Sequence, residues 1–183
     1  LANVQYVRGY GGDIGGEYNG VTTGQSLQDD RTPEQLTAEA VEAAKKADYV
    51  IFVGGMNKAH NQDCEDGDRL HYELPYAQDQ LITALAAVND HVIFVSISGN
   101  AHGMPWCNDV EAILQAWYSG SETGHAVADV IFGDVNPSGK LPYTIQPTLA
   151  DYPAHQYGEI AYPGVDKQVH YLEDIFVGYR YAD

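Results

Sequence analysis

Acidic side chains crowd one short stretch of the sequence, NQDCEDGDRL at residues 61–70. Four carboxyl groups and one arginine lie there, and five residues separate the stretch from the apolar run DYVIFVGG at residues 48–55. Burial or neighbouring negative charge can keep one of several carboxyl groups protonated near neutral pH, which a general acid requires. These carboxyl groups could therefore do chemistry, or the stretch, Glu65 included, could be only a solvated loop.

Other residues of this stretch have simpler interpretations. Adjacent Asp68 and Arg69 are typical of pairs that fix a loop rather than react. No strand is followed by G-x-G-x-x-G or a P-loop, so we expect no nucleotide cofactor. The potential metal ligands match no compact zinc spacing, and we predict no metal site; they are His60, Asp63, Cys64, Glu65 and His71.

Aromatic residues follow two later apolar runs. Trp106, Trp117 and Tyr118 could stack against a sugar or could cover the end of a sheet, and 14 tyrosines with two tryptophans would suit a carbohydrate binder. Cys107 and His102 are close in sequence, but no G-x-S-x-G turn accompanies them. A cysteine or serine nucleophile therefore has little support.

Composition limits the class of protein. The chain has 183 residues, 44% of them hydrophobic, which is enough for one domain with a real core. Nine basic against 26 acidic residues give a formal net charge of -17, which repels nucleic acid and anionic membranes. We find no run of about 18 apolar residues that could span a bilayer. The opening LANVQYVRGY lacks an initiator Met, so we expect a piece of a longer protein.

Apolar runs alternate with helical patterns along the chain. Thr32, Pro33 and Gln35 form a helix-start signature, and the following apolar face comprises Leu36, Ala40, Val41 and Ala44. Further helices are predicted at 73–89 and 121–133, and strands at 4–7, 49–53, 91–98, 111–117 and 140–145. Apart from the strand at residues 4–7, we predict that residues 1–30 are irregular. The alternation favours a mainly parallel sheet with helices on both faces.

This architecture gives the acidic stretch a location. In an open α/β sheet, ligands bind beyond the carboxyl ends of the strands. Three segments leave strands in that direction, at residues 54–69, 98–107 and 117–122. The first is long compared with the usual βα connection of about 2–6 residues, and such loops are often functional.

Five segments carry a family signature, in the order AAKKADYVIFVGG, EDGDRLHYELPYAQDQLI, VIFVSISGNAHGMPW, AILQAWYSGSETGHAVADVIFGDVNPSGKLPYTI and EDIFVGYRYAD. Together they resemble the C-terminal α/β sandwich domain of glycoside hydrolase family 3, whose members include β-glucosidases and β-xylosidases. The resemblance covers nearly everything from about Ala43 to the end, and residues 112–145 are its most specific part. It implies that residues 1–183 are this domain.

The resemblance assigns roles within the acidic stretch. Many members carry E-G-x-D-R there, and the glutamate protonates the glycosidic oxygen; aligned on Asp68 and Arg69, it falls on Glu65. Here Asp66 follows Glu65, so Asp63 and Asp66 remain alternative acids. Retaining glycosidases also need a nucleophile about 5 Å from the acid. In this family the nucleophile is an aspartate of a preceding (β/α)8 barrel, which we expect outside this chain.

The implied fold is a flavodoxin-like three-layer α/β sandwich. The resemblance implies that the chain is the C-terminal domain of a retaining exo-β-glycosidase, most simply a β-glucosidase. In that enzyme Glu65 would be the general acid/base, and the residues that bind substrate would be Asp68, Arg69 and Trp106. Expected partners are a β-linked oligosaccharide or glycoside and the protein's own N-terminal barrel, without cofactor, metal, nucleic acid or membrane, in a periplasmic or secreted location. The alternatives are a noncatalytic domain that braces the barrel and a free-standing module that binds carbohydrate or another small ligand.

Two geometric expectations follow. The loop at residues 57–69 should project from the carboxyl edge of the sheet. A surface that normally meets a barrel should expose an apolar or aromatic patch, for which the Trp106 and Trp117–Tyr118 loops are the candidates.

Overall fold

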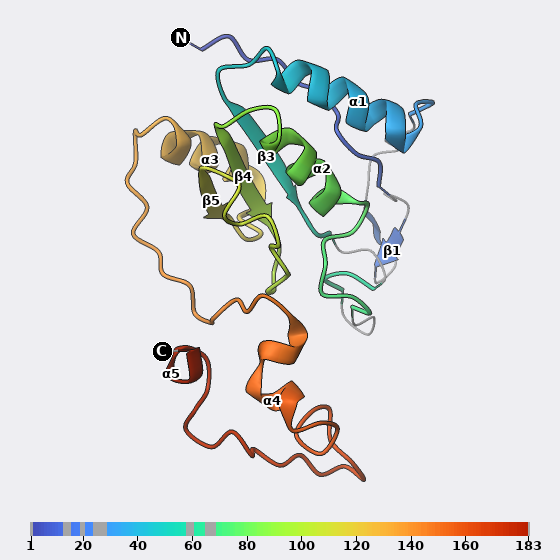
Figure 1. Cartoon of the computed structure of the whole chain (residues 1–183), viewed down its shortest axis with the longest axis vertical. Coiled ribbons are helices and arrows are strands. Elements are labelled where there is room, and N and C mark those ends of the chain that lie inside the picture. Colours follow the sequence, from blue (N-terminus) through green and yellow to red (C-terminus); the bar gives the residue numbers. More distant parts are fainter. Residues whose placement is uncertain are drawn as a thin grey trace.

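A three-stranded parallel sheet forms the centre of the molecule (Figure 1). The computed structural model describes residues 2–12, 16–18, 21–23, 29–57, 61–64 and 69–182. The strands are β3 (Val50–Gly55), β4 (Val92–Ile97) and β5 (Ala112–Gln115), in the order β3-β4-β5. Their apolar sequences suit strands whose faces are covered, and the predicted strands at 49–53, 91–98 and 111–117 are confirmed.

The first helix begins where the sequence predicts. In α1 (Pro33–Ala44) the Thr32 hydroxyl accepts from the Gln35 backbone N–H, and the Gln35 side chain accepts from the Thr32 N–H. These reciprocal bonds satisfy donors that a helix start leaves unpaired. The buried positions are Leu36, Ala40 and Ala44, on the face that the apolar spacing indicates.

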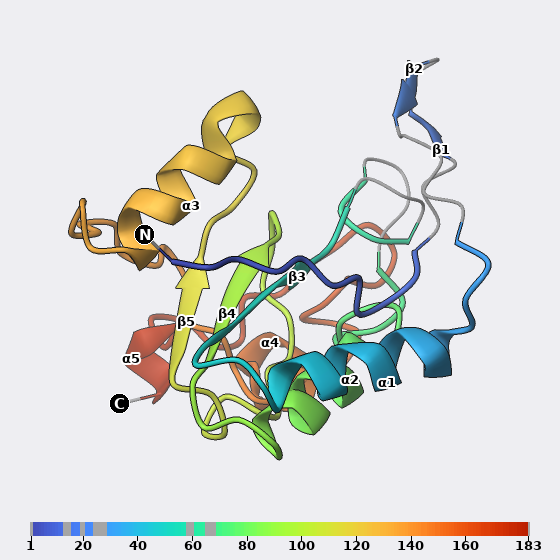
Figure 2. The same ribbon diagram turned by 90° about the horizontal axis from the view of Figure 1, so that it is seen from above.

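The core lies between the sheet and two helices. α1 and α2 (Gln78–Ala86) cover one face, whereas α3 (Thr123–Ile131) lies on the opposite side (Figure 2). On the first face Phe52 and Phe94 stack with ring centroids 5.7 Å apart. The fully buried apolar side chains around them are Leu81, Ile82, Val92 and Trp106. The α/β sandwich class, with a parallel sheet and helices on both sides, is confirmed.

The two faces of the sheet are covered unequally. α3 buries none of its residues. The side chains of Ile51 and Val53 on β3, and of Tyr49 just before it, are 42%, 54% and 58% exposed, while Phe52 is buried. The described residues therefore leave an apolar row of β3 open on the α3 side.

Two glycines end β3. Gly55 has φ +129°, and a Cβ there would lie 2.1 Å from the Ile97 carbonyl oxygen. A Cβ on Gly54 would lie 2.4 Å from Oε1 of Gln78, a fully buried side chain. The Gln78 amide accepts from Gly55 N and donates to Gly55 O, both at 2.8 Å. Only glycine permits this close approach of strand end to helix start.

Other elements differ from the prediction. Residues 4–7 form no strand; Val7 and Tyr10 pack against the core instead. The segment predicted as irregular contains a short antiparallel pair, β1 (Gly16–Tyr18) and β2 (Val21–Thr23). α2 begins five residues later than predicted, because Tyr76 and Ala77 have φ of 61° and 56°, which a helix cannot contain. Residues 140–145 form no strand either and connect the sheet to the C-terminal part.

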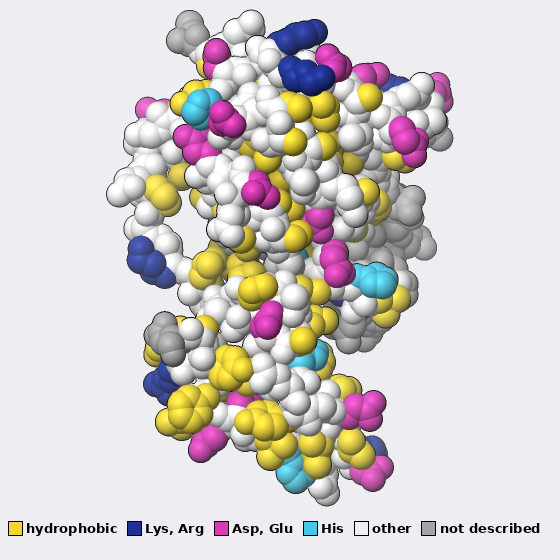
Figure 3. Space-filling view, in the orientation of Figure 1, with side chains coloured by type: hydrophobic (Ala, Val, Ile, Leu, Met, Phe, Trp, Pro, Cys, Tyr) yellow, Lys and Arg dark blue, Asp and Glu magenta, His cyan; other side chains and the backbone are white. Residues whose placement is uncertain are grey.

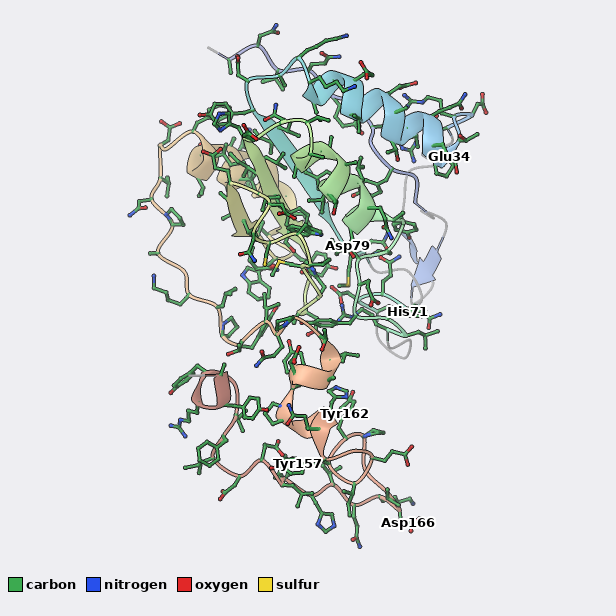
Figure 4. All side chains as sticks on the ribbon, viewed as in Figure 1. Glu34, His71, Asp79, Tyr157, Tyr162 and Asp166 are labelled. Carbon is green, nitrogen blue, oxygen red and sulfur yellow. The ribbon has the colours of Figure 1, made fainter. Side chains whose placement is uncertain are left out.

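Residues 146–182 form a separate lobe below the sheet (Figure 1). It contains α4 (Pro153–Gln156), α5 (Tyr179–Ala182) and a 3-10 turn at Leu149–Asp151; another such turn, Gly120–Glu122, precedes α3. Hydrophobic side chains are prominent on the surface of this lobe in Figure 3, and Tyr157 and Tyr162 are labelled there in Figure 4. The large hydrophobic side chains of this lobe that are at least 55% exposed are Tyr162, Tyr171, Ile175, Phe176, Val177 and Tyr179.

Gly55→Ala should destabilise the chain by about 3 kcal/mol or more, because the new methyl group meets the Ile97 carbonyl and the backbone conformation disfavours a side chain. Chemical denaturation followed by circular dichroism measures this loss. The matched control is Gly124→Ala in α3, where a Cβ meets nothing within 4 Å. That variant should be neutral or more stable, because alanine favours a helix. Equal stability of the two variants would contradict the assigned role of Gly55.

Candidate functional site

Three loops meet at the carboxyl edge of the sheet. The chain leaves β3 at Met56, whose N–H donates to Ile97 O at 2.8 Å, at the end of β4. Ala116 N, after β5, donates to Ser96 O at 2.9 Å. The ends of the three strands are thus fixed side by side, and the three segments that the sequence places at this edge do leave from it.

One carboxylate joins all three loops. Oδ2 of Asp63 accepts from Gly99 N at 2.6 Å and from the Tyr118 hydroxyl at 2.8 Å. Asp63 follows β3, Gly99 follows β4 and Tyr118 follows β5. These three residues are called the three-loop junction below. The pKa of Tyr118 is raised, chiefly by burial and then by its hydrogen bond to Asp63, so the hydroxyl stays protonated and donates.

Further hydrogen bonds fix the described part of the loop after β3. Asn57 N donates to Gln62 Oε1 at 3.0 Å, and Asp63 N donates to Asn57 O at 3.0 Å. Gln62 Nε2 donates to the Tyr76 hydroxyl at 2.6 Å, just before α2. Residues 57 and 61–64 therefore have a defined position at the edge of the sheet.

Arg69 anchors the other end of the acidic stretch. Its Nη2 donates to Ala101 O at 2.5 Å, and its Nη1 lies 3.3 Å from the Met56 sulfur. The guanidinium is thus held by the loop after β4, as expected for a residue that fixes a loop. Contact of Arg69 with substrate stays a prediction.

The acids between these anchors lie outside the described residues. Glu65, Asp66 and Asp68 belong to the range 65–68, for which the structure gives no description. Glu65 as acid, Asp68 as substrate ligand and Asp66 as alternative acid therefore stay predictions. The described neighbours on both sides, Cys64 and Arg69, belong to the loop that leaves the carboxyl edge.

Trp106 requires a correction. Its side chain is 1% exposed, its ring centroid lies 4.7 Å from that of Phe94, and its indole N–H donates to Asp79 Oδ1 at 2.7 Å. Asp79, labelled in Figure 4, also accepts from Leu74 N at 3.1 Å. The residue predicted to bind sugar is therefore part of the core in this arrangement. Its polar edge is satisfied by a carboxylate 27 positions away, which sequence spacing does not reveal.

The exposed apolar side chains lie mainly outside the two loops where the sequence predicts an aromatic patch. Tyr118 is 42% exposed, whereas Trp117 is only partly exposed and packs edge-on against Tyr143, with ring centroids 5.7 Å apart. The more exposed apolar side chains lie on β3 and on the C-terminal lobe. An exposed apolar surface therefore exists, but Trp106 is not part of it.

A cavity of about 420 Å³ opens beside the acidic loop. Its described lining combines polar and apolar groups, a combination that suits a sugar or an aglycone. It is lined by Met56, Asn61, Gln62, Arg69, Leu70, His71, Glu73, Leu74 and Pro75. His71, at the outer side of this region, is labelled in Figure 4.

Sequence reasoning missed a buried polar network behind the edge. His102, 1% exposed, bonds Ser96 Oγ through Nε2 at 2.9 Å and Gly103 O through Nδ1 at 2.9 Å. Because the carbonyl can only accept, Nδ1 carries the proton and Nε2 accepts from the serine. Burial lowers the pKa of His102. The considered partner Cys107 is exposed and contributes no nucleophile to this network.

Tyr72 connects this region to the C-terminal lobe. Its hydroxyl donates to Gln146 O at 2.8 Å and lies 3.0 Å from the Tyr152 hydroxyl. The two rings meet edge-on, with centroids 6.0 Å apart. The pKa of Tyr72 is raised, mainly by burial.

Two kinds of feature are absent from the part of the chain that the structure describes. Within residues 2–12, 16–18, 21–23, 29–57, 61–64 and 69–182, no three His, Cys, Asp or Glu residues gather as metal ligands. In the same ranges, every helix is too short or too polar to cross a bilayer.

Comparison with known proteins identifies the family. Residues 3–179 match the Glycosyl hydrolase family 3 C-terminal domain. The chain belongs to this family. It is 55% identical over 152 residues to Beta-glucosidase BoGH3A of Bacteroides ovatus, covering 83% of the chain and 20% of that protein. It is 38% identical to Thermostable beta-glucosidase B of Acetivibrio thermocellus over 160 residues, covering 87% of the chain and 20% of that protein.

Solved structures agree with this family fold. A β-glucosidase from Kluyveromyces marxianus matches with a TM-score of 0.75 and 36% identity, over 84% of the chain and 18% of that protein. DesR, a β-glucosidase from Streptomyces venezuelae solved in complex with D-glucose, matches with a TM-score of 0.71 and 36% identity, over 82% of the chain and 19% of that protein. The chain spans about a fifth of the length of these relatives.

Trp106→Phe should lower the free energy of unfolding by about 2–4 kcal/mol, because the buried Asp79 carboxylate loses a charge-assisted donor and the smaller ring leaves space. Urea denaturation measures the loss. Trp117→Phe makes the same chemical change at a less buried position and should cost clearly less. A larger loss of stability in Trp117→Phe than in Trp106→Phe would contradict the assigned role of the Trp106 indole in the core.

The stability of the chain should fall as the pH drops below about 6.5, the ordinary pKa of histidine, because burial lowers the pKa of folded His102. Below that pH the unfolded chain binds a proton that the folded chain resists, so acid favours unfolding. Urea midpoints between pH 7.5 and 5 should decline less steeply in His102→Asn. His125→Asn, at an 86% exposed side chain, is the control and should keep the wild-type slope. An unchanged slope in His102→Asn would contradict this role.

Proposed function

We propose that the chain is the C-terminal domain of a retaining exo-acting β-glucosidase that removes terminal nonreducing β-glucosyl residues. Membership of the family carries the proposal, together with relatives and solved neighbours named β-glucosidases at up to 55% identity. Glu65 is the proposed general acid/base. Its support is the match of E-D-G-D-R at residues 65–69 to the family motif, at a loop that leaves the carboxyl edge.

The proposed reaction has two steps. In the first, Glu65 gives its proton to the glycosidic oxygen while a nucleophilic aspartate attacks the anomeric carbon, so the aglycone leaves and a glycosyl-enzyme ester forms. In the second, the Glu65 carboxylate takes a proton from water, and the water oxygen attacks the anomeric carbon and releases the aspartate. Asp63, Asp66 and Asp68 are close to Glu65 in the sequence, and neighbouring negative charge favours the protonated form of a carboxyl group.

The nucleophile belongs, in this proposal, to a (β/α)8 barrel in another part of the same protein. The chain spans about a fifth of its relatives' length, which leaves room for such a domain. The exposed apolar row on β3 and the apolar surface of the C-terminal lobe are surfaces that a covalently linked domain would cover. Substrate would then bind between the barrel and the three loops.

The decisive experiment is Glu65→Ala in the full-length protein. Hydrolysis should slow by about 100-fold or more for glucosides with poor leaving groups, and much less for activated aryl glucosides that depart unaided. Azide should partly rescue the variant and yield a β-glucosyl azide, because it attacks the glycosyl-enzyme without needing a base. Steady-state kinetics and product analysis provide the measurement.

Matched substitutions test the neighbouring acids. Asp66→Ala in the same protein should show neither the leaving-group dependence nor azide rescue. If Asp66→Ala shows both and Glu65→Ala shows neither, the acid is Asp66. The isolated chain should not hydrolyse aryl β-glucosides, because it lacks the proposed nucleophile. Hydrolysis by the isolated chain, or near wild-type rates in every variant, would refute the proposed role.

A further inference from the structure

The three-loop junction depends on the Asp63 carboxylate. A single oxygen, Oδ2, accepts both the Gly99 N–H and the Tyr118 hydroxyl, at 2.6 and 2.8 Å. Gly99 leaves room for this arrangement: a Cβ there would lie 3.1 Å from Cε2 of Tyr118 and 3.5 Å from Oδ2 of Asp63. The junction is therefore closely packed as well as hydrogen-bonded, and it fixes Asp63 relative to all three strands.

The same short segment after β4 holds both sides of the acidic tetrapeptide at residues 65–68. Asp63, two residues before Glu65, binds the N–H of Gly99. Arg69, which directly follows the tetrapeptide, binds the carbonyl of Ala101. Both anchors are charged side chains on backbone groups, and such bonds are stronger than those between neutral partners.

We propose that Asp63 is a positioning residue, which fixes the start of the acid-bearing segment through Gly99 and Tyr118. The inference rests on the proposed function, with Glu65 as acid/base. A general acid must reach the glycosidic oxygen within hydrogen-bond distance, and a misplacement of about 1 Å can cost about 100-fold in rate. Because Asp63 is two residues from Glu65, release of its carboxylate lets the start of that segment shift.

The geometry also separates Asp63 from the acid itself. A general acid presents its proton to substrate, whereas Oδ2 of Asp63 accepts two hydrogen bonds from the protein. The Tyr118 hydroxyl is held protonated by burial and can only donate in this contact. Asp63, which the sequence leaves open as an alternative acid, is thereby assigned a supporting role.

The two roles predict opposite results for one isosteric variant. Asparagine can place its carbonyl oxygen where Oδ2 lies and still accept from Gly99 and Tyr118, but it cannot serve as an acid. If Asp63 positions, Asp63→Asn should retain activity that Asp63→Ala loses. If Asp63 is the acid, both variants should be equally inactive.

The test uses the full-length protein and glucosides with good and poor leaving groups. With a poor leaving group, Asp63→Ala should lower kcat by about 30-fold, Tyr118→Phe by about fivefold, and Asp63→Asn by less than about threefold. KM should change little. The double variant Asp63→Ala/Tyr118→Phe should match Asp63→Ala alone, because both changes break one junction. With an activated leaving group, all losses should shrink.

Tyr143→Phe is the control. It also removes a tyrosine hydroxyl near this edge, but that hydroxyl has no hydrogen-bond partner among the described residues, so kcat should remain within about twofold of wild type. Assays run well below the melting temperature of each variant separate positioning from simple stability. Normal leaving-group dependence in Asp63→Ala, with only its melting temperature lowered, overturns the proposal.

Two further outcomes keep this inference separate from the proposed function. Azide rescue of Asp63→Ala with no activity in Asp63→Asn overturns the positioning role and makes Asp63 the acid. Wild-type kinetics in Glu65→Ala refutes the proposed role of Glu65 as general acid/base, whatever the Asp63 variants do. The positioning role is supported when Glu65→Ala is impaired and rescued, and Asp63→Asn retains what Asp63→Ala loses.

Discussion

The carboxyl edge of this domain depends on how β3 ends. The buried Gln78 amide binds both backbone groups of Gly55, and the absence of a side chain at Gly54 and Gly55 lets α2 and β4 approach. Since Gln78 begins α2, one side chain fixes a strand end and a helix start together. The loop between them, residues 56–77, is thus held at both ends by a single contact in the core.

Several charged side chains of this acidic protein form hydrogen bonds with backbone groups or an indole rather than ion pairs. Asp63 and Arg69 each bind backbone groups of the segment after β4, so neither needs the other as partner. Asp79 uses its carboxylate in the same way inside the core, with Leu74 N and the Trp106 indole as donors. Backbone amides and indoles can hold an acidic chain together where few lysines and arginines are present.

Much of the fold follows from local sequence, and the contacts of the site do not. α1 was predictable because its cap and its apolar face lie within a few residues of one another. The late start of α2 was not, because the positive φ of Tyr76 and Ala77 carries no residue signal such as glycine. The bond from Asp63 to Tyr118 joins residues 55 positions apart, so only the folded sheet brings them together. The family signature pointed to the acidic loop, yet it could not assign Asp63 its two donors.

The Tyr72 hydroxyl has a consequence for where this domain can be divided. It joins the chain just beyond the acidic loop to Gln146 and Tyr152, across more than 70 positions. A fragment trimmed after α3 would contain the whole sheet but would leave that buried hydroxyl without its acceptor, and a buried polar group without a partner costs about 1–3 kcal/mol. A fragment that keeps both contacts of this hydroxyl therefore extends through Tyr152, and a recombination point for exchanging sheets between homologues belongs beyond it.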